Sequence, residues 1–238
     1  MTIVNFSIVI PCYNEEKNIT LIVERVKPLL VRKDIELILV DNGSTDTTRS
    51  QIKHYTQQYP VIKLCTVKKN IGYGFGILSG LRVARGTFVG WTHADLQTDP
   101  MDTLKALAIL QQQPLPETIF VKGRRYGRPL FDKFFTWGMN IFETLILRTF
   151  LYEINAQPNV FHRSFLTLLK QPPNDFSFDL YTYYLAKKNN YTLKRFPVYF
   201  GKRIYGESKW NTGLKAKFKF IKRTLKFSFQ LKKLLKHQ

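Results

Sequence analysis

Short apolar runs alternate with amphipathic segments through roughly the first hundred residues of the chain. The apolar runs are rich in β-branched and aromatic residues and predict strands, at residues 6–11, 35–40, 61–67 and 87–91. Between them, apolar residues recur at spacings of three and four, which is typical of helices with one buried face. The alternation predicts an α/β fold, with a mostly parallel sheet flanked by helices.

Polar residues follow the predicted strands where each strand ends. Residues 13–15 follow the first strand, residues 41–46 follow the second, and His93, Asp95 and Gln97 follow the fourth. Because the carboxyl ends of parallel strands face one edge of a sheet, we expect these three groups to converge. A carboxylate among other donors at such an edge is suited to a hard cation, which would help to hold an anionic ligand.

Local residue types predict the helix starts and the later elements. Asn14 is predicted to cap the first helix, and Ser44 or Thr45 the second. The helix expected at residues 130–152 is strongly apolar and aromatic, and is either packed in the core or an amphipathic helix that contacts a membrane. The other expected elements are strands at residues 117–122 and 191–200 and helix-containing segments at residues 160–170 and 178–187.

The charge of the chain is strongly unbalanced. Its 238 residues include 37 Lys and Arg against 17 Asp and Glu, a formal net charge of +20. Such an excess indicates an anionic partner, which could be nucleic acid, a phosphorylated ligand or an anionic membrane surface. No acidic residue follows Glu207, so the basic excess is concentrated at the carboxyl end.

Residues 214–238 form a predicted helix with a lysine stripe between apolar and aromatic arcs. That pattern is typical of an interfacial helix on an anionic membrane. A core-packed helix with a solvated lysine face and a basic nucleic-acid arm remain open alternatives. We therefore divide the chain into a domain at residues 1–210 and a basic, amphipathic helical tail at residues 211–238.

Cysteine usage and hydropathy bear on the cellular location. Cys12 and Cys65 lie in predicted strands without a CxxC spacing, so we expect buried, reduced thiols. The start of the chain lacks the pattern of a signal peptide, and no run approaches the ~18 apolar residues of a membrane span. These features predict a cytoplasmic protein that is peripheral on the inner face of a membrane.

Four motifs in order resemble those of glycosyltransferase family 2, and most closely its polyprenyl- and dolichyl-phosphate mannosyl- and glucosyltransferase branch. The motifs are SIVIPCYNEE at residues 7–16, DNGSTD at residues 41–46, NIG at residues 70–72 and ADLQ at residues 94–97. Each is weak alone, but their order and their positions at strand ends make the signal specific. The resemblance covers roughly residues 6–210 and implies the GT-A fold and a nucleotide-sugar donor.

The resemblance also implies roles for residues at the strand ends. The donor would lie against Pro11, Tyr13, Glu15, Asp41, Asn70, Gly72, His93, Ala94 and Gln97. A divalent cation, Mn²⁺ or Mg²⁺, would be held on the donor diphosphate by Asp95, Gln97 and His93. A cation there would stabilise the negative charge that develops on the leaving diphosphate.

Two positions depart from the family pattern. Asn42 stands where the family usually has a second aspartate, and His93 stands where it has the first aspartate of Asp-Ala-Asp. Imidazole binds Mn²⁺ more readily than Mg²⁺, which prefers oxygen. His93 would therefore bind a softer cation, contact the donor phosphate directly or mark weaker metal dependence, and an inactive site remains an alternative.

Basic residues later in the chain are assigned to phosphate or acceptor binding. The resemblance implies that Arg203, Ser208 and Lys209 bind phosphate, and Arg124 and Arg125 suit the same role because a guanidinium fork matches phosphate geometry. Arg128 is instead expected to be a solvated surface charge.

Asp179 distinguishes two kinds of acceptor. It is either the base that a sugar-hydroxyl acceptor needs or a helix-capping or structural residue. A phosphate acceptor is already an anion and needs no base. Residues 155–161 also differ from the branch, because Asn155 and Val160-Phe161 replace its acidic residue and Gly-Phe pair.

These observations predict an inverting glycosyltransferase with Asp95, Asp179 and Arg203 as its catalytic residues. Its partners would be a nucleotide-sugar donor, a lipid-phosphate acceptor and an anionic membrane surface. The first choice of acceptor is polyprenyl phosphate, and the alternative is a sugar hydroxyl of a lipid-linked glycan or polysaccharide. A non-catalytic protein that binds nucleic acid or membrane is the remaining class; we expect no nucleic acid and leave a homo-oligomer open.

Overall fold

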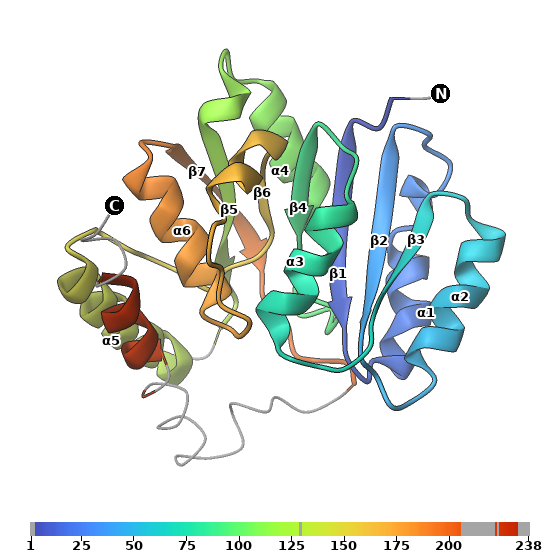
Figure 1. Cartoon of the computed structure of the whole chain (residues 1–238), viewed down its shortest axis with the longest axis horizontal. Coiled ribbons are helices and arrows are strands. Elements are labelled where there is room, and N and C mark those ends of the chain that lie inside the picture. The colour runs from blue at the N-terminus through green and yellow to red at the C-terminus, as the bar shows by residue number, and fades with distance from the viewer. Residues whose placement is uncertain (1–2, 129, 206–221, 223, 233–238) are drawn as a thin grey trace.

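The computed structural model describes residues 3–128, 130–205, 222 and 224–232. Within them, a 7-stranded sheet has the order β3-β2-β1-β4-β6-β5-β7 (Figure 1). The strands are β1 (Phe6–Cys12), β2 (Ile35–Asn42), β3 (Ile62–Val67), β4 (Phe88–Trp91), β5 (Ile119–Tyr126), β6 (Asn159–His162) and β7 (Thr192–Tyr199). The helices are α1 (Glu16–Arg25), α2 (Thr48–Gln58), α3 (Tyr73–Val83), α4 (Asp102–Gln111), α5 (Leu130–Leu147) and α6 (Phe178–Lys188).

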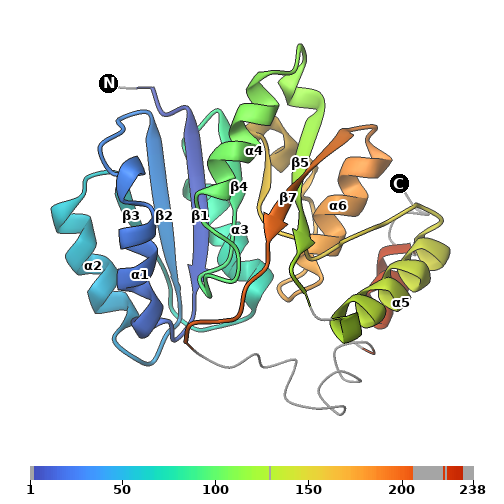
Figure 2. The same cartoon turned by 180° about the vertical axis from the view of Figure 1, so that it is seen from behind.

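The helices cover both faces of the sheet, as the sequence predicts. Helices α1, α2 and α4 lie over one face (Figure 2), and α3 and α6 lie over the other (Figure 1). Strand β1 shows why: Ile8 and Ile10 are buried in the core cluster that includes α1 and α4, whereas Val9 is buried in the cluster that includes α3. Alternate side chains of a strand point to opposite faces, so a fully apolar run is buried on both sides.

The mostly parallel arrangement is confirmed, with β6 as the exception. Strand β6 pairs antiparallel with both β4 and β5, while β5 pairs parallel with β7. The prediction of a helix-containing segment at residues 160–170 is therefore wrong at its start, and a 3₁₀ helix (Arg163–Leu168) follows the strand. Because β6 has only 4 residues, pairing with its two neighbours defines it rather than any local pattern.

The predicted helix caps are also wrong. Helix α1 begins at Glu16, and the Oδ1 atom of Asn14 accepts a hydrogen bond from the Thr45 backbone amide at 2.9 Å. The Ser44 hydroxyl accepts from the Asn14 amide at 3.1 Å, while Asp46 serves the start of α2 by accepting from the Thr48 amide at 3.0 Å. The side chains that were expected to cap their own helices join the two neighbouring loops instead.

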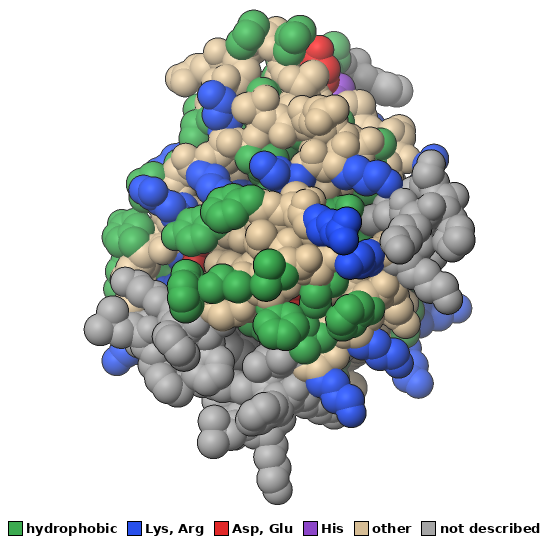
Figure 3. Space-filling model, turned by 90° about the vertical axis from the view of Figure 1, so that its left-hand side faces the viewer, with side chains coloured by type: hydrophobic (Ala, Val, Ile, Leu, Met, Phe, Trp, Pro, Cys, Tyr) green, Lys and Arg blue, Asp and Glu red, His purple; other side chains and the backbone are tan. Residues whose placement is uncertain are grey.

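The described part of the tail packs against α5 as a helix. Residues 224–232 are helical. Leu231 is 1% exposed, and the Ser228 hydroxyl donates a hydrogen bond to Glu143 of α5. Helix α5 exposes apolar side chains on its outward side (Figure 3).

No helix in the described residues is long and apolar enough to cross a membrane. The boundary predicted at residues 210 and 211 lies outside the described residues.

Glu143 makes this tail contact sensitive to pH. Burial raises the pKa of Glu143 from 4.5 to about 7, although the bond from Ser228 opposes the shift. The folded state then binds more protons than the unfolded state between these values. We therefore expect the free energy of unfolding to fall by up to ~3 kcal/mol as the pH rises from about 4.5 to about 7, and to level off above that.

Urea unfolding at pH 5 and pH 8 measures this dependence. Glu143→Gln serves as the matched control, because an amide keeps the shape of the side chain and does not titrate. The free energy of unfolding of the wild type, relative to that of Glu143→Gln, should be lower at pH 8 than at pH 5. An unchanged difference would contradict the assignment.

Candidate active site

The carboxyl ends of β1, β2 and β4 meet at one edge of the sheet, the lower edge in Figure 1. The Glu15 backbone amide donates to the Thr48 hydroxyl at 2.8 Å, which ties the loop after β1 to the loop after β2. Burial is the main cause that raises the pKa of the Glu15 carboxyl, and the negative charge of nearby Asp95 adds to it. The structure thus brings together acidic side chains that are separated by 80 positions in the sequence.

Asp41 and the glycines of the neighbouring loops shape the floor of this edge. Asp41 is 3% exposed and accepts a hydrogen bond from the Ser44 amide at 2.9 Å. Gly43 has a φ of +73°, and a Cβ there would lie 2.4 Å from the Asn70 backbone nitrogen. A side chain at Gly43 would therefore displace the segment that carries Asn70 and Gly72.

Asp95, Gln97 and Arg203 form the centre of the site. The Nη2 atom of Arg203 lies 2.8 Å from Asp95 Oδ2, and the Asp95 side chain is 8% exposed. The Nε atom of Arg203 donates to Gln97 Oε1 at 3.2 Å. The resemblance implied a cation site for Asp95 and Gln97 and phosphate binding for Arg203, and the structure brings the three residues into contact across more than a hundred positions.

The segment after β7 crosses the edge and is fastened to Gln97. The Gly201 amide donates to the Gln97 carbonyl at 2.7 Å, and the Gln97 side-chain amide donates to the Gly201 carbonyl at 3.1 Å. In Figure 2 this segment runs along the lower edge from β7 towards the end of β1. Lys17 of α1 lies over the Tyr205 ring at 6.0 Å from its centroid. We call residues 200–205 the strap; the predicted phosphate contacts Ser208 and Lys209 lie outside the described residues.

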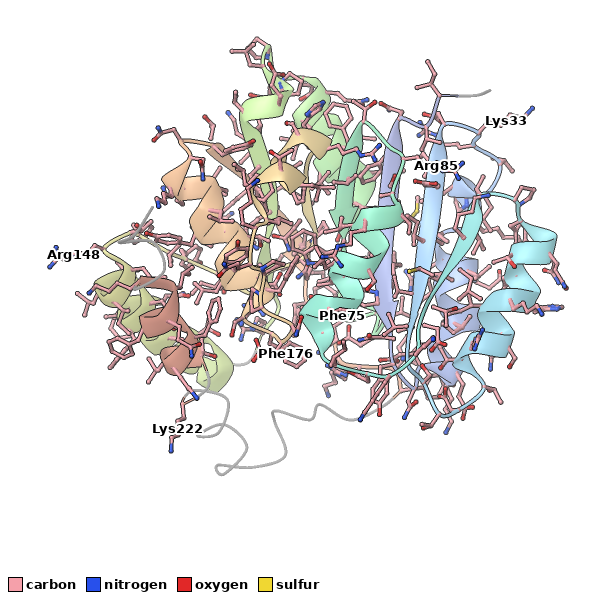
Figure 4. The ribbon with its side chains drawn as sticks, viewed as in Figure 1. Lys33, Phe75, Arg85, Arg148, Phe176 and Lys222 are labelled. Atoms are coloured by element: carbon pink, nitrogen blue, oxygen red, sulfur yellow. The ribbon has the colours of Figure 1, made fainter. Side chains whose placement is uncertain are left out.

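His93 belongs to an aromatic stack at the same edge. Its ring is stacked on Tyr73 with centroids 5.4 Å apart, and Tyr73 is stacked on Phe176 at 4.8 Å. Phe176 lies at the lower end of the sheet near α3 (Figure 4). Burial, with the charges of Asp179 and Asp95, raises the pKa of the Tyr73 hydroxyl well above its ordinary value. The stack fixes the His93 ring against Tyr73, and His93 is close enough to Asp179 for its charge to act on that carboxylate.

Asp179 lies in a buried polar cluster below this stack. It is 2% exposed, and its Oδ1 atom accepts from Gln157 Nε2 at 2.8 Å and from Trp91 Nε1 at 3.3 Å. Asn159 Nδ2 is a third donor at 3.3 Å. The alternative of a helix-capping Asp179 is wrong, since the donors are side chains from other elements.

Lys122 is the cation of this cluster, and sequence reasoning missed it. Its ammonium group is fully buried and donates to the Ala156 carbonyl at 3.1 Å and to Asn159 Oδ1. Burial lowers the pKa of Lys122 to about 7, against the opposing charge of Asp179. For Asp179, burial raises the pKa, and Lys122 and His93 oppose the rise. The register explains the grouping, because Asn159 of β6 pairs with both Trp91 of β4 and Lys122 of β5.

The arginines after the fifth strand differ from one another. Arg125 Nε and Arg128 Nη1 lie 2.6 and 3.3 Å from the two carboxylate oxygens of Glu153. Arg128 is 8% exposed, so its prediction as a solvated surface charge is wrong. Arg124 is exposed, although it lies within β5, which pairs with β7 up to Tyr126. Arg125 is thus held by a carboxylate within the described structure, while Arg124 faces solvent.

The donor set at Asp95 fits a divalent cation only in company with an anionic ligand. The described residues contain no group of three or more His, Cys, Asp or Glu arranged to hold a metal. Asp95 supplies one carboxylate, and His93 and Gln97 add an imidazole and an amide oxygen. The Oδ2 atom of Asp95 already contacts the positive charge of Arg203. Cations that take one protein carboxylate and complete their shell with phosphate oxygens suit such a site, and the imidazole favours Mn²⁺.

Solved structures with the same fold support the predicted architecture. Glucosyl-3-phosphoglycerate synthase from Mycobacterium tuberculosis, solved with Mn²⁺ and UDP, matches with a TM-score of 0.71 at 17% identity, over 96% of this chain and 79% of that one. A mannosyltransferase from Pyrobaculum calidifontis, solved with GDP-mannose and Mn²⁺, matches with a TM-score of 0.64 at 20% identity, over 86% of this chain and 58% of that one. At these identities the likeness concerns the fold alone, and it confirms the predicted GT-A fold.

Curated relatives match over shorter stretches. A dodecaprenyl-phosphate galacturonate synthase from Rhizobium johnstonii is 33% identical over 112 residues, which are 46% of this chain and 33% of the relative. A dolichyl-phosphate beta-glucosyltransferase from Trichomonas vaginalis is 32% identical over 94 residues, which are 37% of this chain and 28% of the relative. These matches span about a third of the length of the curated relatives. The model of Glycosyl transferase family 2 matches residues 7–167, more than half of the chain, and this chain therefore belongs to that family.

Proposed function

We propose that this chain transfers a sugar, with inversion, from a nucleotide-sugar donor to a lipid-linked acceptor, with polyprenyl phosphate as the first choice. The observation that carries the proposal is the Asp95 carboxylate, held 2.8 Å from the Arg203 guanidinium where the strands end. The similarity to a dodecaprenyl-phosphate galacturonate synthase and a dolichyl-phosphate beta-glucosyltransferase supports a lipid-phosphate acceptor.

The strand ends offer separate places for the parts of the donor. Pro11, Tyr13 and Asp41 lie at the ends of β1 and β2, where an aromatic face suits a base and a carboxylate suits ribose hydroxyls. The guanidinium of Arg203 suits the diphosphate, because its planar fork matches two phosphate oxygens. Asp95, with His93 and Gln97, would hold a divalent cation, which when bound would act as a Lewis acid towards the diphosphate.

The environment of Asp179 supports a phosphate acceptor over a hydroxyl acceptor. Its carboxylate is 2% exposed and accepts hydrogen bonds from three side chains. A general base must come within hydrogen-bond reach of the proton it takes. A phosphate acceptor needs no such base, so we assign Asp179 to the support of the strand ends. The hydroxyl acceptor becomes the alternative outcome of the assay below.

A panel of donors and acceptors tests the function. The full chain is incubated with UDP-, GDP- and CDP-sugars, Mn²⁺ or Mg²⁺, and either polyprenyl phosphate or a lipid-linked glycan. We expect release of nucleoside diphosphate only with polyprenyl phosphate, and faster release with Mn²⁺ because His93 supplies nitrogen. Turnover with the glycan alone would favour the hydroxyl acceptor. Absence of turnover, together with salt-sensitive binding of nucleic acid, would reject the enzyme.

A further inference from the structure

Helix α5 and the residues after it expose an unusual amount of apolar surface. Leu145 is 70% exposed, Phe142 is 53% exposed and Phe150 is 71% exposed. We define the α5 apolar surface as the exposed side chains Trp137, Ile141, Phe142, Leu145, Phe150 and Tyr152. Figure 3 shows apolar side chains gathered on this side of the molecule. Contiguous exposed apolar surface of this kind marks a site that meets a protein, a ligand or a membrane.

The opposite side of α5 is already used. Glu143, Ile146 and Leu147 are buried, and Ser228 of the tail donates its hydrogen bond to Glu143. Ile141 and Leu145 are four positions apart, so they lie along one stripe of the helix. The sequence left open a core-packed or a membrane-contacting α5; in the structure one side of the helix is packed, and the other exposes apolar side chains.

The exposed charged side chains described at residues 136–152 and in the tail are basic. Among residues 136–152 and the described tail residues, the acidic side chain is Glu143, which is fully buried. Arg148, Lys222 and Lys226 are exposed, and Figure 4 shows Arg148 and Lys222 pointing away from the molecule. Figure 3 shows further Lys and Arg side chains beside the apolar ones. Apolar side chains flanked by cations suit the acyl chains and anionic headgroups of a membrane.

We propose that the α5 apolar surface docks this chain on an anionic lipid bilayer. The sequence offered both the tail and the helix at residues 130–152 for membrane contact, but the described tail residues bury Leu231 and bond Ser228 to α5. The described tail residues add the exposed cations Lys222 and Lys226 near α5. Contact with a bilayer through α5 requires neither a membrane-spanning helix nor release of the tail.

The position of α5 links the docking surface to the candidate site. The helix begins at Leu130, shortly after β5 ends at Tyr126, and lies beside the lower edge of the sheet (Figure 1). That edge carries Asp95 and Arg203. This part of the inference rests on the proposed function: a bilayer under α5 would keep a lipid-anchored phosphate near the site while its chain stays in the membrane.

Flotation with vesicles tests the docking surface. The full chain is mixed with phosphatidylcholine vesicles that contain or lack 30% phosphatidylglycerol, and the floated fraction is measured. We expect flotation only with the anionic vesicles, and at least a fivefold loss in the double variant Phe142→Glu/Leu145→Glu. The matched control is Leu115→Glu, which alters a side chain that is 58% exposed next to the 3₁₀ helix Pro116–Thr118 and should float like the wild type. Thermal melting shows whether each variant is folded.

Three results would overturn the proposal. One is a wild type that does not float with anionic vesicles. Another is a folded double variant that floats as well as the wild type. The third is a wild type that sediments as a dimer and a double variant that sediments as a monomer, without flotation of either, which would make the surface a contact between two copies.

Activity with two forms of the acceptor separates docking from the proposed function. A short-chain, water-soluble polyprenyl phosphate should be used equally well, within about twofold, by the wild type and Phe142→Glu/Leu145→Glu. With the long-chain acceptor in vesicles, the double variant should lose at least tenfold. If no protein turns over either acceptor, the proposed function fails, and the flotation result still decides the docking surface.

Discussion

Replacement of Asp95 by asparagine is expected to lower kcat/KM for sugar transfer by about a hundredfold or more, with little change in stability. Asparagine keeps an oxygen that can accept the hydrogen bond from the Gln97 backbone amide. It removes the negative charge that lies 2.8 Å from Arg203. Loss of one preorganised electrostatic contact at a reacting diphosphate is worth about 10²–10³ in rate. The measurement is steady-state transfer with the donor and acceptor that the panel identifies.

The control for this variant is Asp99→Asn, four residues further along the chain. Asp99 pairs with Arg25 at 3.5 Å, and both side chains are more than a third exposed. Such surface pairs contribute little, so activity within about twofold of the wild type is expected. Binding of Mn²⁺ in the presence of nucleoside diphosphate provides a second readout, which should weaken in Asp95→Asn alone. Full activity in Asp95→Asn would remove the centre of the proposed site.

Replacement of Lys122 by methionine is expected to destabilise the fold by about 3–5 kcal/mol, because it removes one partner from a buried, charged cluster. The Lys122 ammonium is fully buried and bonds to Asn159 and the Ala156 carbonyl. Without it, Asp179 keeps its donors but loses the positive charge that most opposes the rise of its pKa. Urea unfolding of the wild type and the variant measures the loss.

The double variant Lys122→Met/Asp179→Asn distinguishes a charge pair from simple packing. If Lys122 and Asp179 are coupled, the double variant should be clearly more stable than the sum of the two single losses predicts. The expected coupling is about 1–3 kcal/mol. Strict additivity would mean that the two groups act separately, and that the cluster is held by its amide side chains alone.

The sequence predicts those features that depend on neighbours along the chain. Strands β1, β2 and β4 are apolar runs buried on both faces, and their polar ends converge because parallel order leaves no other place for them. The family motif implied that Arg203 binds phosphate, but its contact with Asp95 was not predicted, since nothing local relates residues 108 positions apart. The helical spacing of α6 was likewise sufficient to locate it.

The features that sequence reasoning missed depend on segments that meet only in the folded chain. Strand β6 has 4 residues and exists by pairing with β4 and β5. Arg128 is buried because Glu153, from a separate loop, accepts its guanidinium. Lys122 offered one local signal, a charge within an apolar strand, which indicates a buried cation and therefore a buried partner.

Under the proposed function, the strap would let the site distinguish a nucleoside diphosphate from a nucleoside. Within the described structure, Arg203 is held by Asp95 and Gln97, and Gln97 also fastens Gly201. A diphosphate that reaches Arg203 would compete with the Asp95 carboxylate for the guanidinium, which could then change its ion-pair partner. A neutral nucleoside has no anion to compete with Asp95, so the contacts of Arg203 with Asp95 and of Gly201 with Gln97 would remain. Under the proposed function, selection for the charged form of the donor would thus follow from the contact between Arg203 and Asp95.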